Sequence, residues 1–437
     1  MDRLEIGLIG LALTFTLVGL RVPIAVSLGV VSFFGIWAII SLSAAWGIVT
    51  AIPFDWVGDF SFSAVPMFML MGYIASKSGM TAGIFGAMRI FLWRVPGALA
   101  CASVAACALF AAASGSSVAT AAAMSRIAIP EMLKANYDKA LATGTIAASG
   151  TLGSLIPPSI LMILYGIFAE QSIGKLFIGG FIPGFLSALI YMGMVMARVT
   201  VWPSLAPKLE RETTREERMA AIRDIWPFPP LVFFVLGGIF LGWFTPTEAG
   251  AVGAFFAFVL ALVRRGMSWR IFREIMVEAT EGTAAIFIIA VTAVIFTRFM
   301  ALSGVPGYLA DVMLSVGSHP LILIAQISLI YIILGMFIDS IGLMLITLPI
   351  ILPMLHAGNV DLIWFGIIVI KLLEIGLITP PIGLNVYMIK GALGNTVTLG
   401  TVFRGTFWFL AMDIVTLALI ITFPQLVLWL PSLMVDN

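Results

Sequence analysis

Apolar stretches recur along the whole chain and are separated by short polar segments. Most of these stretches are about 17–25 residues long, the length that a helix needs to cross a bilayer. One strongly hydrophilic segment, residues 207–224, interrupts the pattern near the middle with five Lys/Arg and five Asp/Glu side chains. We interpret this segment as a solvated connector between two halves. The pattern therefore predicts an all-α polytopic membrane protein.

The two halves resemble each other when the chain is aligned with itself at the offset that places Ser117 on Ser340. The same offset aligns further identical residues: Pro130 with Pro353, Gly153 with Gly376, Pro157 with Pro380, Pro158 with Pro381, and Leu161 with Leu384. A double proline at the same place in both halves, with a matching glycine before it, indicates an internal repeat.

Each half also contains an apolar segment of roughly forty residues with a polar or flexible middle, at residues 114–117 and residues 337–342. Each arm is too short for a comfortable crossing if the polar tip lies at mid-membrane. We therefore expect two re-entrant hairpins. Two ordinary helices joined by a short loop are the alternative.

Positive charges suggest how the two hairpins are oriented. Arg89, Arg94, Lys134 and Lys139 flank the first hairpin, whereas the loops around the second contain no Lys or Arg. Positive loops face the cytoplasm, so the first hairpin should open inward and the second outward. The expected architecture has about ten full spans, two re-entrant hairpins and two broken helices, arranged as inverted repeats. The connector is then cytoplasmic, and both termini are periplasmic.

The double prolines predict a break in one helix of each half. A proline lacks an amide donor, so Pro157 and Pro158 free the carbonyls of Gly153 and Ser154. By the same rule, Pro380 and Pro381 free the carbonyls of Gly376 and Leu377. A bare carbonyl in hydrocarbon costs several kcal/mol, and a bound cation is one partner that removes this cost. The alternative is a proline kink that neighbouring Ser or Thr hydroxyls satisfy.

The polar residues near the breaks suggest which ion would bind. The first hairpin tip and break offer hydroxyls and carbonyls but no titratable group, which suits Na⁺. The second tip contains Asp339 beside Ser340, opposite Thr379. A carboxylate inside the membrane is expensive, which favours ion binding or coupling over a structural cap. Asn385 lies just beyond the second break and could reach substrate or backbone.

Other charged residues within apolar stretches have simpler interpretations. Lys371 and Glu374 are three residues apart on one helix face and should neutralise each other. Arg298 and Asp413 could pair with one another or contact a partner subunit. Arg126, inside a hairpin arm, could face an anionic substrate or extend toward the cytoplasm.

Composition narrows the functional classes. Hydrophobic residues make up 61% of the chain, charged residues make up 10%, and the net charge is +1, which gives no indication of nucleic-acid binding. The two cysteines, Cys101 and Cys107, lie in an apolar Ala-rich stretch, which argues against a disulfide framework or a cysteine metal site. The sequence contains no GxxxxGK[ST] or HExxH motif. We therefore expect no enzymatic activity and no organic cofactor, with energy taken from an ion gradient or another subunit.

Five segments together carry a specific resemblance: residues 113–132, 150–166, 244–254, 335–354 and 375–391. They resemble the large membrane subunit of tripartite ATP-independent periplasmic (TRAP) transporters. The resemblance implies Na⁺-driven uptake of a small organic acid, such as a C4-dicarboxylate or sialic acid, across a bacterial inner membrane. It also implies an elevator-type motion and two partners: a small four-helix membrane subunit and a periplasmic substrate-binding protein.

The breaks, the tips and the resemblance together predict the functional residues. The expected sodium-binding residues are Ser114, Gly115, Ser116, Ser117, Gly153, Ser154, Pro157, Ile338, Asp339, Ser340, Gly376, Leu377, Thr379 and Pro380. The expected substrate-binding residues are Ser116, Pro158, Ser159, Asp339, Pro381 and Asn385.

The expected domain organisation separates a scaffold from a transport unit. The scaffold comprises residues 1–94, 171–226 (ending in the connector), 227–317 and 393–437, and the transport unit comprises residues 95–170 and 318–392. Two alternatives to a TRAP subunit remain at this point. One is an ion-coupled carboxylate carrier that works without a binding protein, and the other is a channel or a scaffold subunit of a membrane complex.

Overall fold

The computed structural model describes residues 2–207, 214–317 and 319–434. Within these ranges the chain forms helices and turns, with no β-strand. The all-α prediction is therefore confirmed for the described part. The N-terminal part of the expected connector, residues 208–213, lies outside the described residues.

The first helices of each half form much of the periphery. In the N-terminal half these are α1 (Arg3–Gly19), α2 (Ile24–Ile39), α3 (Leu42–Val57), α4 (Ala64–Lys77) and α5 (Met80–Phe91). α11 (Arg215–Ile225) covers the C-terminal part of the connector. It is followed by α12 (Phe228–Val232), α13 (Gly238–Phe240), α14 (Pro246–Val263), α15 (Trp269–Ser303) and α16 (Val305–Val316). α14 packs against α4, and α15 packs against both α2 and α4.

The later helices of each half contain the repeated elements. The first set is α6 (Ala98–Ser114), α7 (Ser117–Lys134), α8 (Lys139–Leu155), α9 (Ile160–Phe168) and α10 (Ile173–Val201). The second set is α17 (Pro320–Gly335), α18 (Ser340–Ala357), α19 (Leu362–Ile378), α20 (Leu384–Leu393) and α21 (Leu399–Thr422), followed by the short α22 (Gln425–Leu428). We call α6 and α7 hairpin 1, and α17 and α18 hairpin 2.

Helix boundaries follow the offset found in the sequence. α7 begins at Ser117 and α18 at Ser340, the first aligned pair, and both helices have 18 residues. α8 and α19 begin at the same offset from each other, and both have 17 residues. The start of each of these two helices is fixed by an equivalent cap: the Asp138 and Asp361 side chains accept hydrogen bonds at the N-termini of α8 and α19. The structure thus supports an internal repeat at the level of whole helices.

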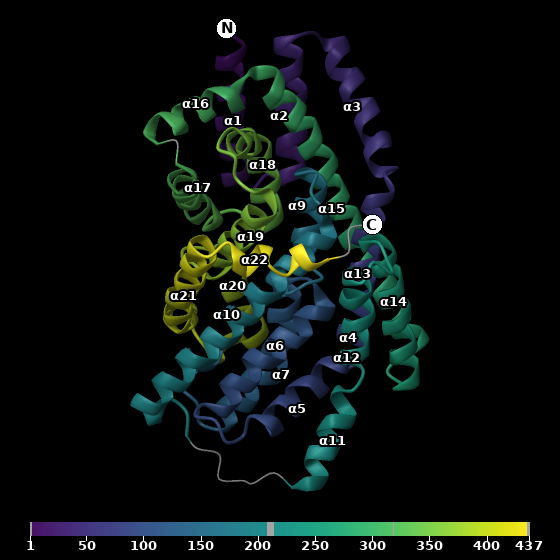
Figure 1. The fold of residues 1–437 in the computed structure, drawn as a ribbon, viewed down its shortest axis with the longest axis vertical. Coiled ribbons are helices and arrows are strands. Elements are labelled where there is room, and N and C mark those ends of the chain that lie inside the picture. Colours follow the sequence, from purple (N-terminus) through teal and green to yellow (C-terminus); the bar gives the residue numbers. More distant parts are fainter. Residues whose placement is uncertain (1, 208–213, 318, 435–437) are drawn as a thin grey trace.

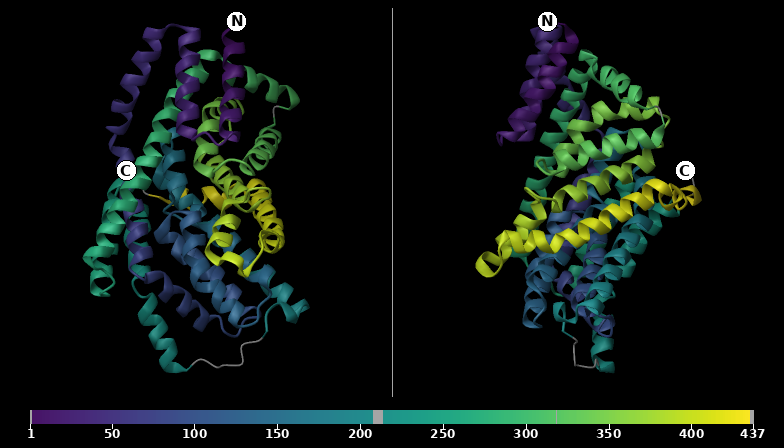
Figure 2. Two further views of the ribbon diagram at one scale, coloured as in Figure 1. Left: turned by 180° about the vertical axis from the view of Figure 1, so that it is seen from behind. Right: turned by 90° about the vertical axis from the view of Figure 1, so that its left-hand side faces the viewer.

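The two hairpins occupy different ends of the molecule. Figure 1 shows α6 and α7 in the lower half, where they contact α5, and α17 and α18 in the upper half, where they contact α16. The two further views agree with this separation (Figure 2). α8 and α19 contact each other between the hairpins, and α21 packs along α8. The broken helices therefore lie where the two repeats meet.

Membrane spans can be assessed from helix length and composition. Among the described residues, six segments are long and apolar enough to cross a bilayer: α10, Arg215–Phe240, α14, α15, α18 and α21. The number rises to nine if each of three bent helix pairs forms one span, among them α8 with α9, which are bent by 41°. The surface also exposes large apolar side chains, such as Phe54 and Trp269. These features support a multi-pass membrane protein, while the finer count of about ten spans stays a prediction.

Candidate functional site

Each hairpin ends in a polar tip that caps its second arm. Gly115 adopts a left-handed conformation (φ +62°) and ends α6, and the Ser116 hydroxyl then accepts a hydrogen bond from the Ala119 amide. In hairpin 2, the Asp339 carboxylate accepts from the Gly342 amide at 3.0 Å. Ser116 and Asp339 each directly precede the first residue of α7 and α18, so both caps occupy the same place in the repeat. Asp339 therefore caps a helix in this structure.

Break 1, residues 156–159, separates α8 from α9 and is fully buried. It contains the Pro157–Pro158 cis peptide, and the next residue, Ile160, donates its amide to the Gly115 carbonyl at 3.2 Å. Gly153 lies so close to hairpin 1 that a Cβ atom there would be 2.6 Å from the Ser116 carbonyl oxygen. The glycine and the tip therefore form one tightly packed unit.

Hydroxyl groups line the contact between hairpin 1 and α8. Ser117 donates to the Thr151 carbonyl at 3.0 Å, and its hydroxyl lies 2.5 Å from that of Ser154. The Ser114 hydroxyl lies 2.7 Å from that of Thr120. These hydroxyls bond to each other and to the Thr151 carbonyl. They therefore do not replace the amide donors that Pro157 and Pro158 cannot provide to the Gly153 and Ser154 carbonyls. The kink alternative, in which hydroxyls satisfy the freed carbonyls, has no support among these bonds.

Break 2, residues 379–383, differs from break 1. Pro380 and Pro381 form a second cis peptide but are exposed. The Thr379 amide donates to the Gly376 carbonyl at 3.3 Å, so this carbonyl has a partner, contrary to the expectation from the prolines alone. The reason is local: Thr379 still has an amide, and the backbone tightens to a three-residue turn there. Gly376 itself packs against Gly335 of hairpin 2, as Gly153 does against hairpin 1.

Residues from both repeats meet around one small cavity of about 120 Å³, which we call the central cavity. Hairpin 1 and α8 contribute Gly115, Ser116, Ser117 and Ser154, while hairpin 2 and α19 contribute Asp339, Ser340 and Leu377. The Ser340 hydroxyl is buried, and no hydrogen-bond partner for it exists among the described residues. Hydroxyl and carboxylate oxygens around a small space form a donor set that suits a hard cation.

The other predicted site residues lie around the central cavity rather than in its wall. Ser159 is buried and caps α9, and Asn385 is buried and donates to the Ala147 carbonyl of α8 at 3.1 Å. The sequence left substrate and backbone as possible partners of Asn385, and in this structure the side chain contacts the backbone. The further predicted residues outside the wall are Ser114, Gly153, Pro157, Pro158, Ile338, Gly376, Thr379, Pro380 and Pro381.

A second, larger cavity of about 350 Å³ adjoins the tip of hairpin 1, and we call it the lateral cavity. It shares Ser116 and Ile160 with the central cavity. Its walls include Lys77 of α4, Glu278 of α15 and Arg126 of α7. The structure thus places Arg126, whose role the sequence left open, along a cavity that reaches the candidate site.

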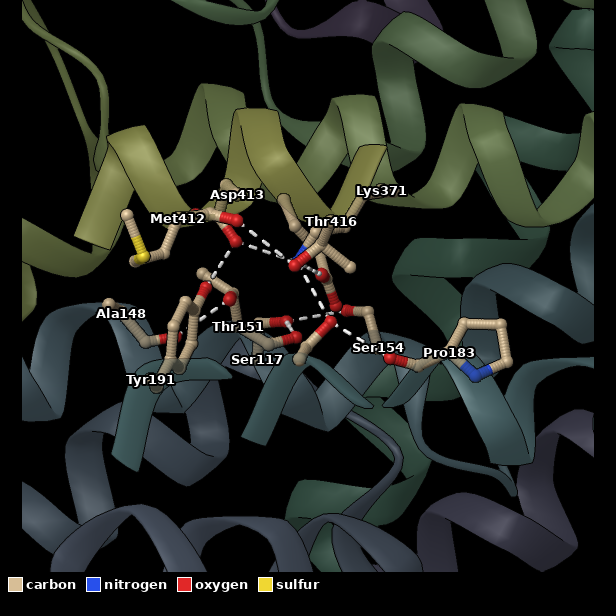
Figure 3. A network of polar contacts seen from close by, with 12 residues as sticks. Ser117, Ala148, Thr151, Ser154, Pro183, Tyr191, Lys371, Met412, Asp413 and Thr416 are labelled. Atoms are coloured by element: carbon tan, nitrogen blue, oxygen red, sulfur yellow. Dashed lines mark hydrogen bonds and ion pairs between the residues drawn. The ribbon is translucent and has the colours of Figure 1, made fainter. Parts of the chain in front are cut away.

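A buried charge cluster lies beside the hydroxyl contacts (Figure 3). The Lys371 ammonium is 2.7 Å from Asp413 of α21 and 3.4 Å from Glu374, and it also contacts Ser187 of α10. Tyr191 of α10 donates to the same Asp413 oxygen. Lys371, Glu374 and Asp413 are fully buried. The expected Lys371–Glu374 pair is therefore present, but it is part of a larger cluster.

Of the two alternatives for Arg298 and Asp413, pairing with one another is wrong, and contact with a partner subunit stays untested. Arg298 is exposed on α15, while Asp413 pairs with Lys371. Sequence patterns could not identify this contact because Lys371 and Asp413 belong to different helices, and Tyr191 comes from the other half of the chain. The only sequence signal was that each is a polar group within an apolar segment.

Comparison with known proteins gives a consistent result. The family model described as "Tripartite ATP-independent periplasmic transporter, DctM component" matches residues 11–426. The chain is 35% identical to the C4-dicarboxylate TRAP transporter large permease protein DctM of Pseudomonas aeruginosa, over 87% of this chain and 88% of that protein. It is 33% identical to the sialic acid TRAP transporter large permease protein SiaM of Vibrio cholerae, over 86% of this chain and 87% of that protein.

Similarity extends to a longer relative and to solved structures. The isethionate TRAP transporter permease protein DctMQ of Oleidesulfovibrio alaskensis is 33% identical over 88% of this chain but only 60% of its own length. Among solved structures, the Alcanivorax borkumensis YdaH transporter matches 89% of this chain and 90% of its own, with TM-score 0.61 and 15% identity. Neisseria gonorrhoeae MtrF matches 88% of this chain and 85% of its own, with TM-score 0.57 and 18% identity. At such identities these two structures indicate a shared fold alone.

Proposed function

Because this chain belongs to the DctM component family of TRAP transporters, we propose that it carries out Na⁺-coupled uptake of a small organic acid anion across the bacterial inner membrane. Its relatives are transporter permeases, not enzymes. Three of them are named for C4-dicarboxylate, sialic acid and isethionate, which are all acids. The proposed substrate class is therefore a small organic acid, and the coupling ion is Na⁺.

The central cavity is the observation that carries this proposal. Ser117 and Ser154 come from the first repeat, and Asp339 and Ser340 come from the second. Their oxygens surround one small space, and hard cations take oxygen ligands. Sites of this kind, between interrupted helices of related halves, are typical of ion-coupled secondary transporters.

The proposed mechanism is alternating access by an elevator-type motion. In this proposal the two hairpins and the broken helices move together against the scaffold helices. Two close backbone contacts support the idea that each hairpin moves with its broken helix: Gly153 packs against Ser116, and Gly376 packs against Gly335. Close backbone contacts between membrane helices of this type permit tight packing.

The proposed partners are a small membrane subunit and a periplasmic substrate-binding protein. Relatives named "large permease protein" support the existence of a smaller permease partner. DctMQ, which extends well beyond the matched region, supports the idea that a second permease component can be fused to the large one. Substrate delivery by a binding protein is the part of the proposal that rests on the family name alone.

Reconstitution would test the proposal. The chain and its small partner would be placed in proteoliposomes, with a binding protein and radiolabelled succinate, N-acetylneuraminate or isethionate outside. We expect saturable uptake of one acid that requires an inward Na⁺ gradient and the binding protein. Saturable Na⁺-driven uptake without the binding protein would instead favour the carrier alternative. Non-saturable flux, or uptake indifferent to Na⁺, would contradict the proposal.

A further inference from the structure

One wall of the lateral cavity is a single face of α7. Ser116, Ala119, Ala123 and Arg126 follow one another at intervals of three and four residues, which places them along one side of the helix. The alanine side chains are short, so the space between the tip of hairpin 1 and Arg126 stays open. The lateral cavity is thus lined both by the tip of hairpin 1 and by the Arg126 side chain.

The charges in this cavity are not equivalent. The Lys77 ammonium is 2.6 Å from Glu278 and 3.6 Å from Glu274, so two carboxylates already offset its charge. Arg126 has no hydrogen bond and no ion pair with any residue that the structure describes, although Glu278, which pairs with Lys77, lines the same cavity. The only cation in the cavity wall that is free to bind an added anion is therefore Arg126, within the described residues.

The spacing along α7 suggests what such an anion would look like. Ser117 and Arg126 are nine residues apart, or about 13 Å along the helix axis. Arg126 is exposed and lines the same cavity as Ser116. Side chains on a helix lean toward its N-terminus, so a guanidinium at this position can reach back toward the tip over roughly half of this distance. The remaining gap suits a short molecule with an acid group at each end.

The tip of hairpin 1 is favourable for the other acid group. It is the N-terminus of an 18-residue helix, where the backbone dipole is positive. It also adjoins the central cavity, where the proposed function places Na⁺. A guanidinium forms paired hydrogen bonds with a carboxylate, which an ammonium cannot do.

We propose that Arg126 determines charge specificity, by binding the second acid group of a short dianion whose first acid group lies at the tip of hairpin 1. This inference rests on the proposed function, because it needs an acid at that tip. Arg126 then discriminates between dianions and monoanions of equal length. The central cavity serves the coupling ion, and the lateral cavity serves the substrate.

Binding to the purified complex of this chain and its small partner would test the inference, without a binding protein. The probes are radiolabelled succinate and, as competitor, butyrate, which has the same chain length and one acid group. With saturating Na⁺, we expect the unaltered complex to bind succinate at least tenfold more tightly than butyrate. Arg126→Gln should weaken succinate binding and so bring the ratio of the two affinities close to one. Arg126→Lys should retain part of the preference for succinate. Lys134→Gln, which removes an exposed cation from the same helix outside both cavities, is the control and should change neither affinity.

Three results would overturn the inference. They are an unchanged succinate affinity in Arg126→Gln, an equal loss of affinity for succinate and butyrate in that variant, and no succinate binding by the unaltered complex. Failure of the proposed function is a separate outcome. If the unaltered complex showed an Arg126-dependent preference for succinate but no Na⁺-driven uptake in proteoliposomes, the specificity assignment would hold and the transport assignment would fall. If Arg126→Gln took up succinate in a Na⁺-driven manner as well as the unaltered complex does, the transport assignment would hold and the specificity assignment would fall.

Discussion

The Lys371 ammonium and the Asp413 carboxylate lie 2.7 Å apart in a fully buried contact between α19 and α21. Glu374 and Tyr191 complete the cluster, so groups from α10, α19 and α21 meet at one point. One oxygen of Glu374 and one of Asp413 have no hydrogen-bond partner among the described residues. Removing the single cation would leave two buried carboxylates without a counter-charge.

We therefore expect Lys371→Met to destabilise the protein by about 3–5 kcal/mol, since breaking a buried ion pair from one side leaves an uncompensated charge. Lys371→Met combined with Asp413→Leu should recover part of this loss, because only Glu374 then lacks a counter-charge. Thermal unfolding of the detergent-solubilised complex would measure both variants. Lys134→Met is the matched control: its surface pair with Glu131 is exposed and worth less than about 1 kcal/mol. Equal destabilisation by the single and double variants would show that lost charge compensation is not the cause.

The hydroxyl contact between Ser117 and Ser154 gives a second prediction. Both residues line the central cavity, and their oxygens are 2.5 Å apart. Ser117→Ala and Ser154→Ala should each raise the Na⁺ concentration for half-maximal uptake several-fold, because each removes an oxygen from the proposed ion site. Sodium titration of uptake in proteoliposomes measures this.

The control for the serine variants is Ser103→Ala. The Ser103 hydroxyl bonds to the Leu99 carbonyl in its own helix, in hairpin 1 but away from the central cavity. It should leave the Na⁺ requirement unchanged. If Ser103→Ala shifted the sodium titration as much as the two cavity variants, the effect would reflect hairpin packing and not ion binding.

Much of this fold could be predicted from the sequence because its main signals are local. A proline changes the backbone at a fixed place, so Pro157 and Pro380 correctly located the two helix breaks. The offset that aligns Ser117 with Ser340 likewise predicts the starts of α18 and α19 from those of α7 and α8. Polar tips between apolar arms predicted where both hairpins turn, at Gly115 and just before Ser340.

Features that depend on packing could not be predicted in this way. The contact of Lys371 with Asp413 forms only because α21 packs along α19, and no spacing in the sequence encodes that choice. The burial of break 1 and the exposure of Pro380 also arise from neighbouring helices, although both breaks have the same double proline. Arg126 was recognisable as unusual, but only the wall of the lateral cavity shows what it faces.

Asp339 offers a way to separate a helix cap from an ion ligand. Asparagine caps helices about as well as aspartate, so Asp339→Asn should keep the bond to the Gly342 amide while removing the charge. We expect Asp339→Asn to lower Na⁺-driven uptake as strongly as Asp339→Ala. Uptake at several Na⁺ concentrations, with protein levels in the membrane measured in parallel, would test this.

Asp361→Asn is the matched control for that comparison. Asp361 caps α19 through the Trp364 amide at 2.8 Å and does not line the central cavity. Its replacement should leave the sodium requirement unchanged. Normal uptake by Asp339→Asn together with impaired uptake by Asp339→Ala would assign Asp339 to capping alone.

Glycine at the two hairpin–helix contacts supports the last prediction. A Cβ atom at Gly153 would lie 2.6 Å from the Ser116 carbonyl oxygen, and one at Gly376 would lie 2.6 Å from the Gly335 carbonyl oxygen. Backbone atoms cannot yield as a flexible side chain can, so Gly153→Ala and Gly376→Ala should each separate a hairpin from its broken helix. Overpacking of this kind costs about 1–3 kcal/mol, and we expect uptake to fall at least tenfold. Gly391→Ala in α20, where an added Cβ meets nothing within 4 Å, should retain full uptake. Because the two contacts are related by the repeat, a loss in one glycine variant with full activity in the other would show that only one hairpin must stay attached to its broken helix during transport.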